Sequence, residues 1–175
     1  MSKKVDGIFR AKDLTEKIWD LYNGKTQKQY DCGFEDLKPY FKIIKPSFIL
    51  MTGTPNCGKS SLTYDMVMRT AKAHKFKYAI FSPEHSLEVN LKRLVEKYLH
   101  KPFDHIFTNR ANEVEVLEAI EFIHEHFFFI DRVGDSPDID WLLDKAQFCV
   151  SEYGIDGMRS EEHTSELQSQ FRISY

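Results

Sequence analysis

Residues 48–60 read FILMTGTPNCGKS, an apolar run that leads directly into a loop of small residues. Within this stretch, residues 53–60 match the pattern G-x-x-x-x-G-K-[ST]. Glycines let a backbone wrap so that successive N–H groups point inward, and the first turn of a following helix adds a positive end. The pattern therefore predicts a loop that holds the phosphates of a nucleotide.

The sequence on either side of the loop agrees with this interpretation. Phe48–Met51 is a short apolar run and a candidate buried strand. After the loop, apolar residues recur at helical spacing over residues 62–74. A strand that enters the loop and a helix that leaves it are the context that the motif requires. The alternative is a tight glycine turn that caps a helix, but such a turn does not explain Lys59 and Ser60 together.

The motif gives its residues separate roles. Lys59 reaches the β- and γ-phosphates, and the Ser60 hydroxyl is a ligand for Mg²⁺. We therefore predict that the chain binds ATP or another nucleoside triphosphate together with Mg²⁺. The predicted nucleotide-binding residues are Gly53, Thr54, Pro55, Asn56, Cys57, Gly58, Lys59, Ser60 and Ser61.

Strands and helices alternate along the rest of the chain. Further candidate strands cover residues 78–81 and 127–130, and another begins at Ile155. Capping boxes at Asp13/Glu16 and Asn112/Glu115 each open a candidate helix, and Gly24 stops the first of these. Two more candidate helices cover residues 87–98 and the stretch from Ser136 and Pro137 to Gly154. Residues 25–38 read as a loop. This alternation predicts an α/β fold with a mostly parallel sheet covered on both faces.

Two carboxylates follow candidate strands. Glu84 comes after residues 78–81, where it could orient or deprotonate the water that attacks the γ-phosphate. Taken alone, a glutamate in this place is more often a solvated loop residue or a helix cap. Asp131 follows residues 127–130 and has the form of a Mg²⁺-associated carboxylate, or of an ordinary turn residue. The seven histidines show no metal-ligand spacing and read as surface or junction residues.

Composition limits the class of protein. The chain has 175 residues, a formal net charge of −3 and three widely spaced cysteines, which fits one globular domain in a reducing compartment. No stretch approaches the roughly 20 apolar residues of a membrane span, and the first residues carry no secretory signal. We therefore expect a cytoplasmic protein of a bacterium or a phage-infected cell, without a membrane partner.

The last residues break the pattern. Residues 159–169 read RSEEHTSELQS, which has neither a strand period nor a helix period and resembles the translation of a common sequencing adapter. An ordinary polar tail is the alternative. We expect residues 159–175 to be non-native, which would leave the sheet incomplete at the C-terminal end.

The order of these motifs resembles the hexameric replicative DNA helicases, the DnaB-like ATPases with a RecA fold, and most of all their Twinkle and phage primase-helicase branch. The resemblance covers about residues 33–158 and rests on the loop at 53–60, the block FSPE at residues 81–84, and the block YGIDGM at residues 153–158. It implies a linker segment with a short helix over residues 1–32 and a partial RecA-like P-loop NTPase domain over residues 33–158.

The resemblance also implies an activity. Glu84 matches the catalytic glutamate of the family, and Lys59 matches the lysine that contacts the phosphates. The whole protein would couple hydrolysis of nucleoside triphosphate to translocation on single-stranded DNA as a homohexameric ring. The family's Walker B aspartate comes a few residues after the block at 153–158, so by that register Asp131 is not the Walker B residue. The DNA-binding loops and arginine finger also lie downstream, so we expect this chain to lack all of them and to be inactive alone. The alternatives are another P-loop ATPase or kinase of the recombinase type, or an inert nucleotide-binding fragment.

Overall fold

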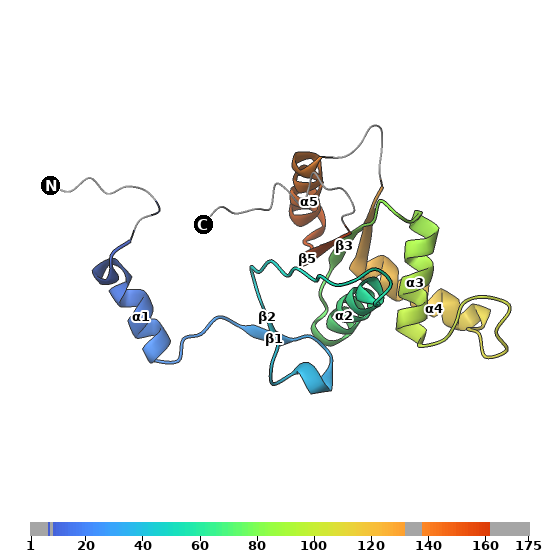
Figure 1. Cartoon of the computed structure of the whole chain (residues 1–175), viewed down its shortest axis with the longest axis horizontal. Coiled ribbons are helices and arrows are strands. Elements are labelled where there is room, and N and C mark those ends of the chain that lie inside the picture. Colours follow the sequence, from blue (N-terminus) through green and yellow to red (C-terminus); the bar gives the residue numbers. More distant parts are fainter. Residues whose placement is uncertain (1–6, 8, 132–137, 162–175) are drawn as a thin grey trace.

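A three-stranded parallel sheet forms the centre of the molecule. The computed structural model describes residues 7, 9–131 and 138–161. Strand β3 (Tyr78–Phe81) lies between β4 (Phe127–Ile130) and β5 (Gly157–Ser160), and both neighbours run parallel to it (Figure 1). The mixed α/β fold predicted from the sequence is confirmed, and the parallel sheet is consistent with a RecA-like core.

Helices cover both faces of this sheet, as predicted. Side chains of β3 alternate between the faces because successive residues of a strand point in opposite directions. Tyr78 and Ile80 join the larger apolar cluster with α2 (Lys59–His74), α3 (Leu87–Leu99) and α4 (Glu113–His126). On the other face, Ala79 packs with Cys149 of α5 (Ile139–Tyr153). The core is therefore one sheet between two helical layers of unequal size.

The ends of α4 and α5 agree with the sequence in two places and differ in one. Asn112 and Glu115 form the predicted capping box of α4, each side chain bonded to the backbone N–H of the other. Gly154 ends α5 with a φ of 64°, a left-handed conformation that glycine adopts without strain. Helix α5 begins later than predicted, because Asp138 is its N-cap and accepts a hydrogen bond from the backbone N–H of Trp141 at 2.8 Å. The predicted cap residues 136 and 137 lie outside the described residues.

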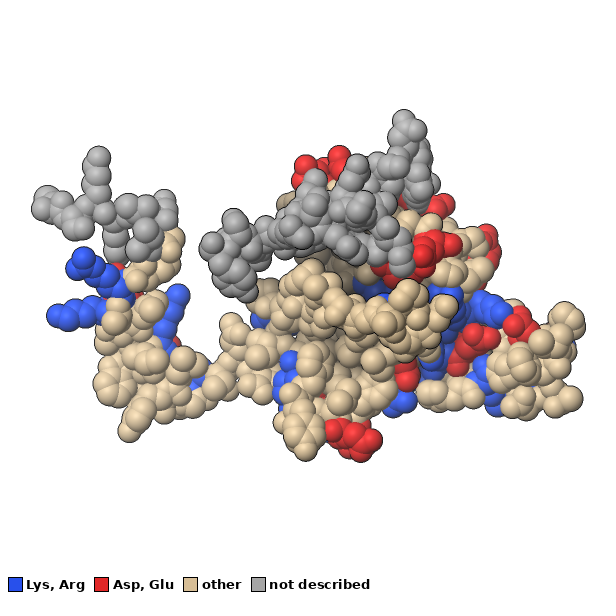
Figure 2. Space-filling model, in the orientation of Figure 1, with Lys and Arg blue, Asp and Glu red and all other residues tan. Residues whose placement is uncertain are grey.

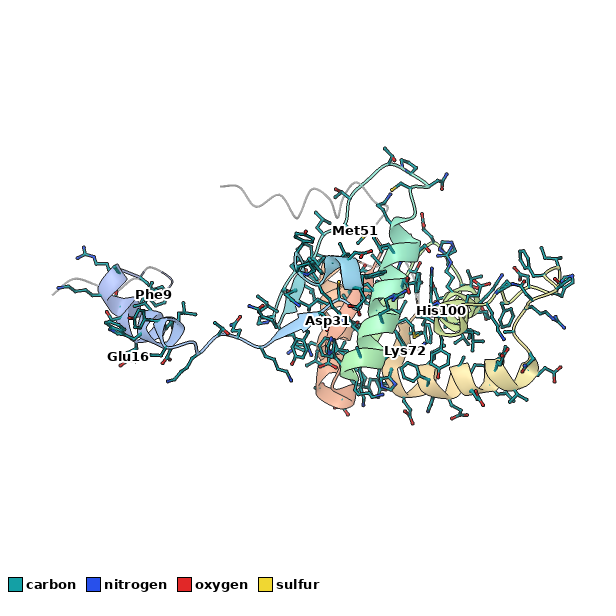
Figure 3. The ribbon with its side chains drawn as sticks, turned by 90° about the horizontal axis from the view of Figure 1, so that it is seen from below. Phe9, Glu16, Asp31, Met51, Lys72 and His100 are labelled. Carbon is teal, nitrogen blue, oxygen red and sulfur yellow. The ribbon has the colours of Figure 1, made fainter. Side chains whose placement is uncertain are left out.

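The first helix stands apart from the sheet. A short 3₁₀ helix, η1 (Ala11–Leu14), leads into α1 (Thr15–Tyr22), and Figures 1 and 2 show both in a lobe separated from the main body. The predicted capping box is wrong, since Asp13 accepts from the N–H of Arg10 at 2.9 Å rather than capping α1. The Asp13 carboxylate, which the sequence pattern assigned to the start of α1, therefore caps η1 instead. In Figure 3, Phe9 and Glu16 mark this lobe.

An antiparallel ribbon occupies part of the region predicted as a loop. Strands β1 (Gln29–Asp31) and β2 (Lys42–Ile44) pair with each other, with η2 (Glu35–Leu37) between them. The ribbon rests on α2, where Arg69 Nη1 donates to the Gly33 carbonyl at 3.2 Å. Gly33 has a φ of +82°, and a Cβ there would lie 2.4 Å from the Cβ of Arg69. This tertiary contact explains why local polar composition did not predict the ribbon.

The predicted strand at residues 48–51 is wrong. These residues carry no strand in the structure, and the side chains of Phe48 and Leu50 are each 72% exposed. An extended segment becomes a strand only where a neighbour pairs with its backbone, and β3 already has β4 on one side and β5 on the other. An apolar run therefore leads into the loop without entering the sheet.

Among the described residues, none of the helices combines the length and the apolar character needed to span a bilayer.

Strand β5 crosses the boundary that we expected between native and foreign sequence. It begins at Gly157, two residues after the predicted start at Ile155, and continues through Arg159 and Ser160. The backbone N–H of Glu161 then donates to the Phe81 carbonyl at 3.2 Å. The sequence pattern had predicted no element at residues 159 and 160. The rest of the predicted tail, residues 162–175, lies outside the described residues.

Candidate nucleotide-binding site

The loop at residues 53–58 turns sharply before α2. Asn56 and Gly58 both have positive φ values, 60° and 89°, which place the backbone in the left-handed region. A Cβ on Gly53 would lie 3.0 Å from the Cys57 sulfur and 3.6 Å from Cδ of Lys59. The missing side chain at position 53 therefore lets the loop close over its own lysine.

Lys59 folds back into this loop. Its ammonium donates hydrogen bonds to the carbonyl oxygens of Gly53 at 2.9 Å and Thr54 at 2.8 Å, and it lies 3.8 Å from the Cys57 sulfur. A charge-assisted bond to an anionic oxygen is stronger than a bond to a neutral carbonyl. The ammonium can therefore exchange these partners for phosphate oxygens without leaving the loop.

The loop ends at the N-terminus of α2. Gly58 is the N-cap, has no side chain to bond the first-turn N–H groups, and accepts through its carbonyl from Leu62 N at 2.9 Å. Unpaired N–H groups and the helix dipole make this end attractive to anions. Ser61 faces α3, where its hydroxyl accepts from Lys97 Nζ at 2.7 Å. Most of the loop is exposed, so its backbone is open to a ligand.

Glu84 lies in the connection from β3 to α3. Ser82 is the first residue after β3 and is buried, whereas Glu84 is exposed. One carboxylate oxygen of Glu84, one ring nitrogen of His85 and one carboxylate oxygen of Glu161 all lie within 4.8 Å of one another. The structure thus gathers ionisable groups from the ends of two neighbouring parallel strands, β3 and β5.

Glu161 joins this cluster to the loop. Its carboxylate accepts hydrogen bonds from the hydroxyls of Ser60 and of Ser82, the latter at 2.5 Å, and pairs with Arg159. Burial would raise the pKa of Glu161, but these hydrogen bonds and the Arg159 charge lower that pKa to about 2. The structure therefore brings the predicted site residues Ser60 and Glu84 close to one carboxylate, that of Glu161.

Asp131 lies elsewhere. It follows β4, which is on the side of β3 opposite to β5, and it is not a member of the cluster found among the described residues. The prediction of a Mg²⁺-associated carboxylate at Asp131 thus gains no support from position. A carboxylate at residue 161 lies beside Ser60 instead.

Hydroxyl and carboxylate oxygens are the hard ligands that Mg²⁺ prefers. Ser60 and Glu161 present such atoms in hydrogen-bond contact with each other, at the mouth of the loop. The residues present therefore fit a magnesium ion.

Sequence reasoning missed the residues that hold the Glu84 loop in place. Asn90 of α3 is 1% exposed and donates through Nδ2 to the carbonyls of His85 at 3.2 Å and Ser86 at 3.0 Å. Its Oδ1 accepts from the hydroxyl of Tyr64 in α2. Arg93 approaches the His85 ring from α3. A polar residue at a core-facing position of a helix, as Asn90 is, was the available signal.

The fold and the loop together define an α/β protein with a parallel sheet and a phosphate-loop sequence at the start of a helix. The chain is 29% identical over 159 residues to a Twinkle homolog protein, chloroplastic/mitochondrial, of Arabidopsis thaliana. The match covers 87% of this chain and 22% of that protein, so the chain spans about a fifth of the length of the curated relative it matches. No protein-family profile matches the chain.

Proposed function

We propose that this chain is part of the NTPase domain of a DnaB-like replicative DNA helicase with a RecA fold. In this proposal, the whole protein couples hydrolysis of ATP or another nucleoside triphosphate to translocation on single-stranded DNA. The observation that carries the proposal is the Lys59 ammonium, held by the carbonyls of Gly53 and Thr54 at the N-terminus of α2. The similarity to the Twinkle homolog supports the choice of a helicase over other P-loop proteins.

The chemistry follows from the arrangement of this chain's own groups. Lys59 and the loop amides hold the phosphates and stabilise charge that develops on the transferring phosphoryl group. Ser60, with a carboxylate at position 161, would hold Mg²⁺, which neutralises phosphate charge when bound. Glu84 orients the attacking water and accepts its proton.

Helix α1 supports assembly into a ring. The side chains of Ile18, Trp19, Leu21 and Tyr22 are all more than half exposed on a helix that lies away from the sheet. Burial of these four side chains against another protein surface would stabilise the assembly. In the proposed homohexamer, α1 packs on the neighbouring subunit, as the resemblance implies for the linker segment.

Replacing the loop lysine tests nucleotide binding. We expect Lys59→Ala to abolish measurable binding of Mg·ATP to the chain, because the ammonium that faces the phosphates is removed. Equilibrium binding of a fluorescent ATP analogue measures this. Lys75→Ala, at the other end of α2, is the matched control and should bind like the unmodified chain. Retained binding by Lys59→Ala would refute the assignment.

Replacing the glutamate tests hydrolysis in the complete protein. We expect Glu84→Gln to bind ATP normally while turnover falls by a factor of about 100 or more, since the amide cannot accept the proton of the water. Steady-state release of inorganic phosphate measures this, with Glu118→Gln on the exposed side of α4 as a control. Unchanged turnover would remove Glu84 from the mechanism and would favour a P-loop protein of another class.

A further inference from the structure

The imidazole beside Glu84 has an orientation that its neighbours determine. Nη2 of Arg93 lies 2.8 Å from Nε2 of His85. A guanidinium has donors only, so Nε2 of His85 must accept this hydrogen bond. A neutral imidazole carries its single proton on the other nitrogen. Arg93 thus fixes the His85 tautomer that carries the N–H on Nδ1.

This Nδ1 N–H lies near Glu161, whose carboxylate contacts Ser60 of the loop. The Nδ1 atom is buried and makes no hydrogen bond within the part of the chain that the structure describes. It lies 3.9 Å from the nearest oxygen of Glu161, and Glu161 accepts in turn from Ser60. In this structure the Glu161 carboxylate is the anionic group between Ser60 and His85. An anionic oxygen of a ligand that reaches this place meets donors from the loop and from the β3–α3 connection together.

The backbone of His85 is held as firmly as its ring. The carbonyl accepts from Asn90, which is itself fixed by the hydroxyl of Tyr64. Tyr64 is 1% exposed and belongs to α2, the helix that follows the loop. The guanidinium of Arg93 lies 5.8 Å from the centre of the Tyr64 ring. His85 is thus tied to both α2 and α3, and a donor with so little freedom loses little entropy when it binds.

The His85 ring does not suit a cation. Glu84, His85 and Glu161 have the spacing of a possible three-ligand metal site. A metal, however, needs a ring nitrogen with a free lone pair. In His85 the lone pair of Nε2 already accepts from the Arg93 cation, and Nδ1 carries the proton. The ring is therefore a hydrogen-bond donor and not a metal ligand.

We propose that the Nδ1 N–H of His85 donates a hydrogen bond to a γ-phosphate oxygen of the bound nucleoside triphosphate, and that Arg93 is the positioning residue that holds the required tautomer. This proposal rests on the proposed function of the loop. It gives the site a means to distinguish a triphosphate from a diphosphate, since the diphosphate has no oxygen at the γ position.

Nitrogen NMR of the histidine rings tests the geometry directly. We expect His85, in the full chain at pH 8, to show the Nδ1-protonated neutral form, and Arg93→Met to convert it to the Nε2-protonated form that free histidine prefers. The Nδ1 proton resonance should shift on addition of Mg·ATPγS and not on addition of Mg·ADP. An Nε2-protonated or doubly protonated ring in the unmodified chain would overturn the proposal, as would an equal response to both nucleotides.

Paired substitutions test the role of the donor. An Asn side chain places an amide N–H near the Nδ1 position, whereas Gln places it near Nε2. We expect His85→Gln to lose about tenfold in its preference for Mg·ATPγS over Mg·ADP, and His85→Asn to retain most of that preference. Equal behaviour of the two variants would refute a specific role for Nδ1.

The two proposals fail in different ways. If the amides of residues 53–61 do not respond to either nucleotide, the proposed function fails, and the γ-phosphate assignment fails with it. If those amides respond and the His85 resonance does not, only the role of His85 is overturned.

Discussion

Two four-residue apolar runs in this chain differ in structure, because one is a buried strand and the other is largely exposed. Tyr78–Phe81 forms β3, is buried throughout and pairs with strands on both sides. Phe48–Met51 is as apolar, yet the structure leaves Phe48, Ile49 and Leu50 from 46% to 72% exposed and outside the sheet. Hydrophobicity alone therefore does not make a strand.

The difference lies in the available backbone partners. β3 has β4 on one edge and β5 on the other, so every N–H and C=O of its four residues has a neighbour within reach. The run at 48–51 pairs with no strand among the described residues. A sheet with further strands would give this run a place, which agrees with the proposal that the chain is a piece of a larger domain.

The largest loss of stability should come from truncating a buried side chain of β3. We expect Ile80→Ala, at a side chain that is 1% exposed, to lower the free energy of unfolding by about 3 kcal/mol because it leaves a cavity in the core. Leu50→Ala, at a side chain that is 72% exposed, should change it by less than about 0.5 kcal/mol. Urea denaturation followed by circular dichroism measures both.

The outcome of this pair decides where residues 48–51 lie. Similar losses for the two variants would contradict the structure and would place the run in the sheet, as the sequence pattern predicts. A small loss for both would mean that β3 itself is poorly packed.

A smaller effect concerns the first residue of β3. Burial, only partly opposed by the hydrogen bond with Thr70, raises the pKa of Tyr78 to about 12. Because an unfolded tyrosine titrates near pH 10, the phenol stabilises the fold fully below about pH 10, and this stabilisation is lost as the pH rises toward 12. We expect a loss of about 2 kcal/mol over that range in the unmodified chain.

Tyr78→Phe separates this titration from other alkaline effects. The variant lacks the phenol, so its unfolding free energy should fall less between pH 10 and 12 than that of the unmodified chain. Denaturation curves at several pH values measure the difference. Parallel pH dependence in the two proteins would show that Tyr78 is not buried as described.

Sequence alone predicted the elements whose signal is local. The helix after the loop, the strands at 78–81 and 127–130, and the Asn112/Glu115 capping box all depend on neighbours within four residues, and the structure confirms them. The β1–β2 ribbon depends on contact with Arg69, far along the chain, and was missed. The strand predicted at residues 48–51 was wrong for the same reason, since this run can form a strand only by pairing with strands that are distant in the sequence.

In the candidate site, too, only the residues of a contiguous motif could be predicted from the sequence. Lys59 and Ser60 could be assigned because the loop motif is contiguous, and these roles remain predictions until binding is measured. The contacts of Asn90 and Arg93 with His85 could not be read from sequence, because α3 brings them to the loop only in the folded chain. Glu161 lies 77 residues after Glu84 and was expected to be foreign sequence.

The identity of residues 159–175 decides whether the chain itself supplies the carboxylate beside Ser60. Sequencing of the encoding DNA around codons 155–175 answers this. A reading frame that continues with apolar residues and an aspartate after Met158 would keep the position at the end of β5 and change its residue. A confirmed Glu161 would make it the native partner of Ser60.

Hydrogen exchange at the loop tests the central claim most directly, because backbone amides are the groups that are proposed to hold the phosphates. The exchange of residues 53–61 is measured with and without Mg·ATPγS, in the unmodified chain and in Lys59→Ala. The proposed function predicts that the nucleotide slows exchange at these amides in the unmodified chain alone, while β3 stays protected throughout. Exchange that is equally fast with and without saturating nucleotide would contradict it.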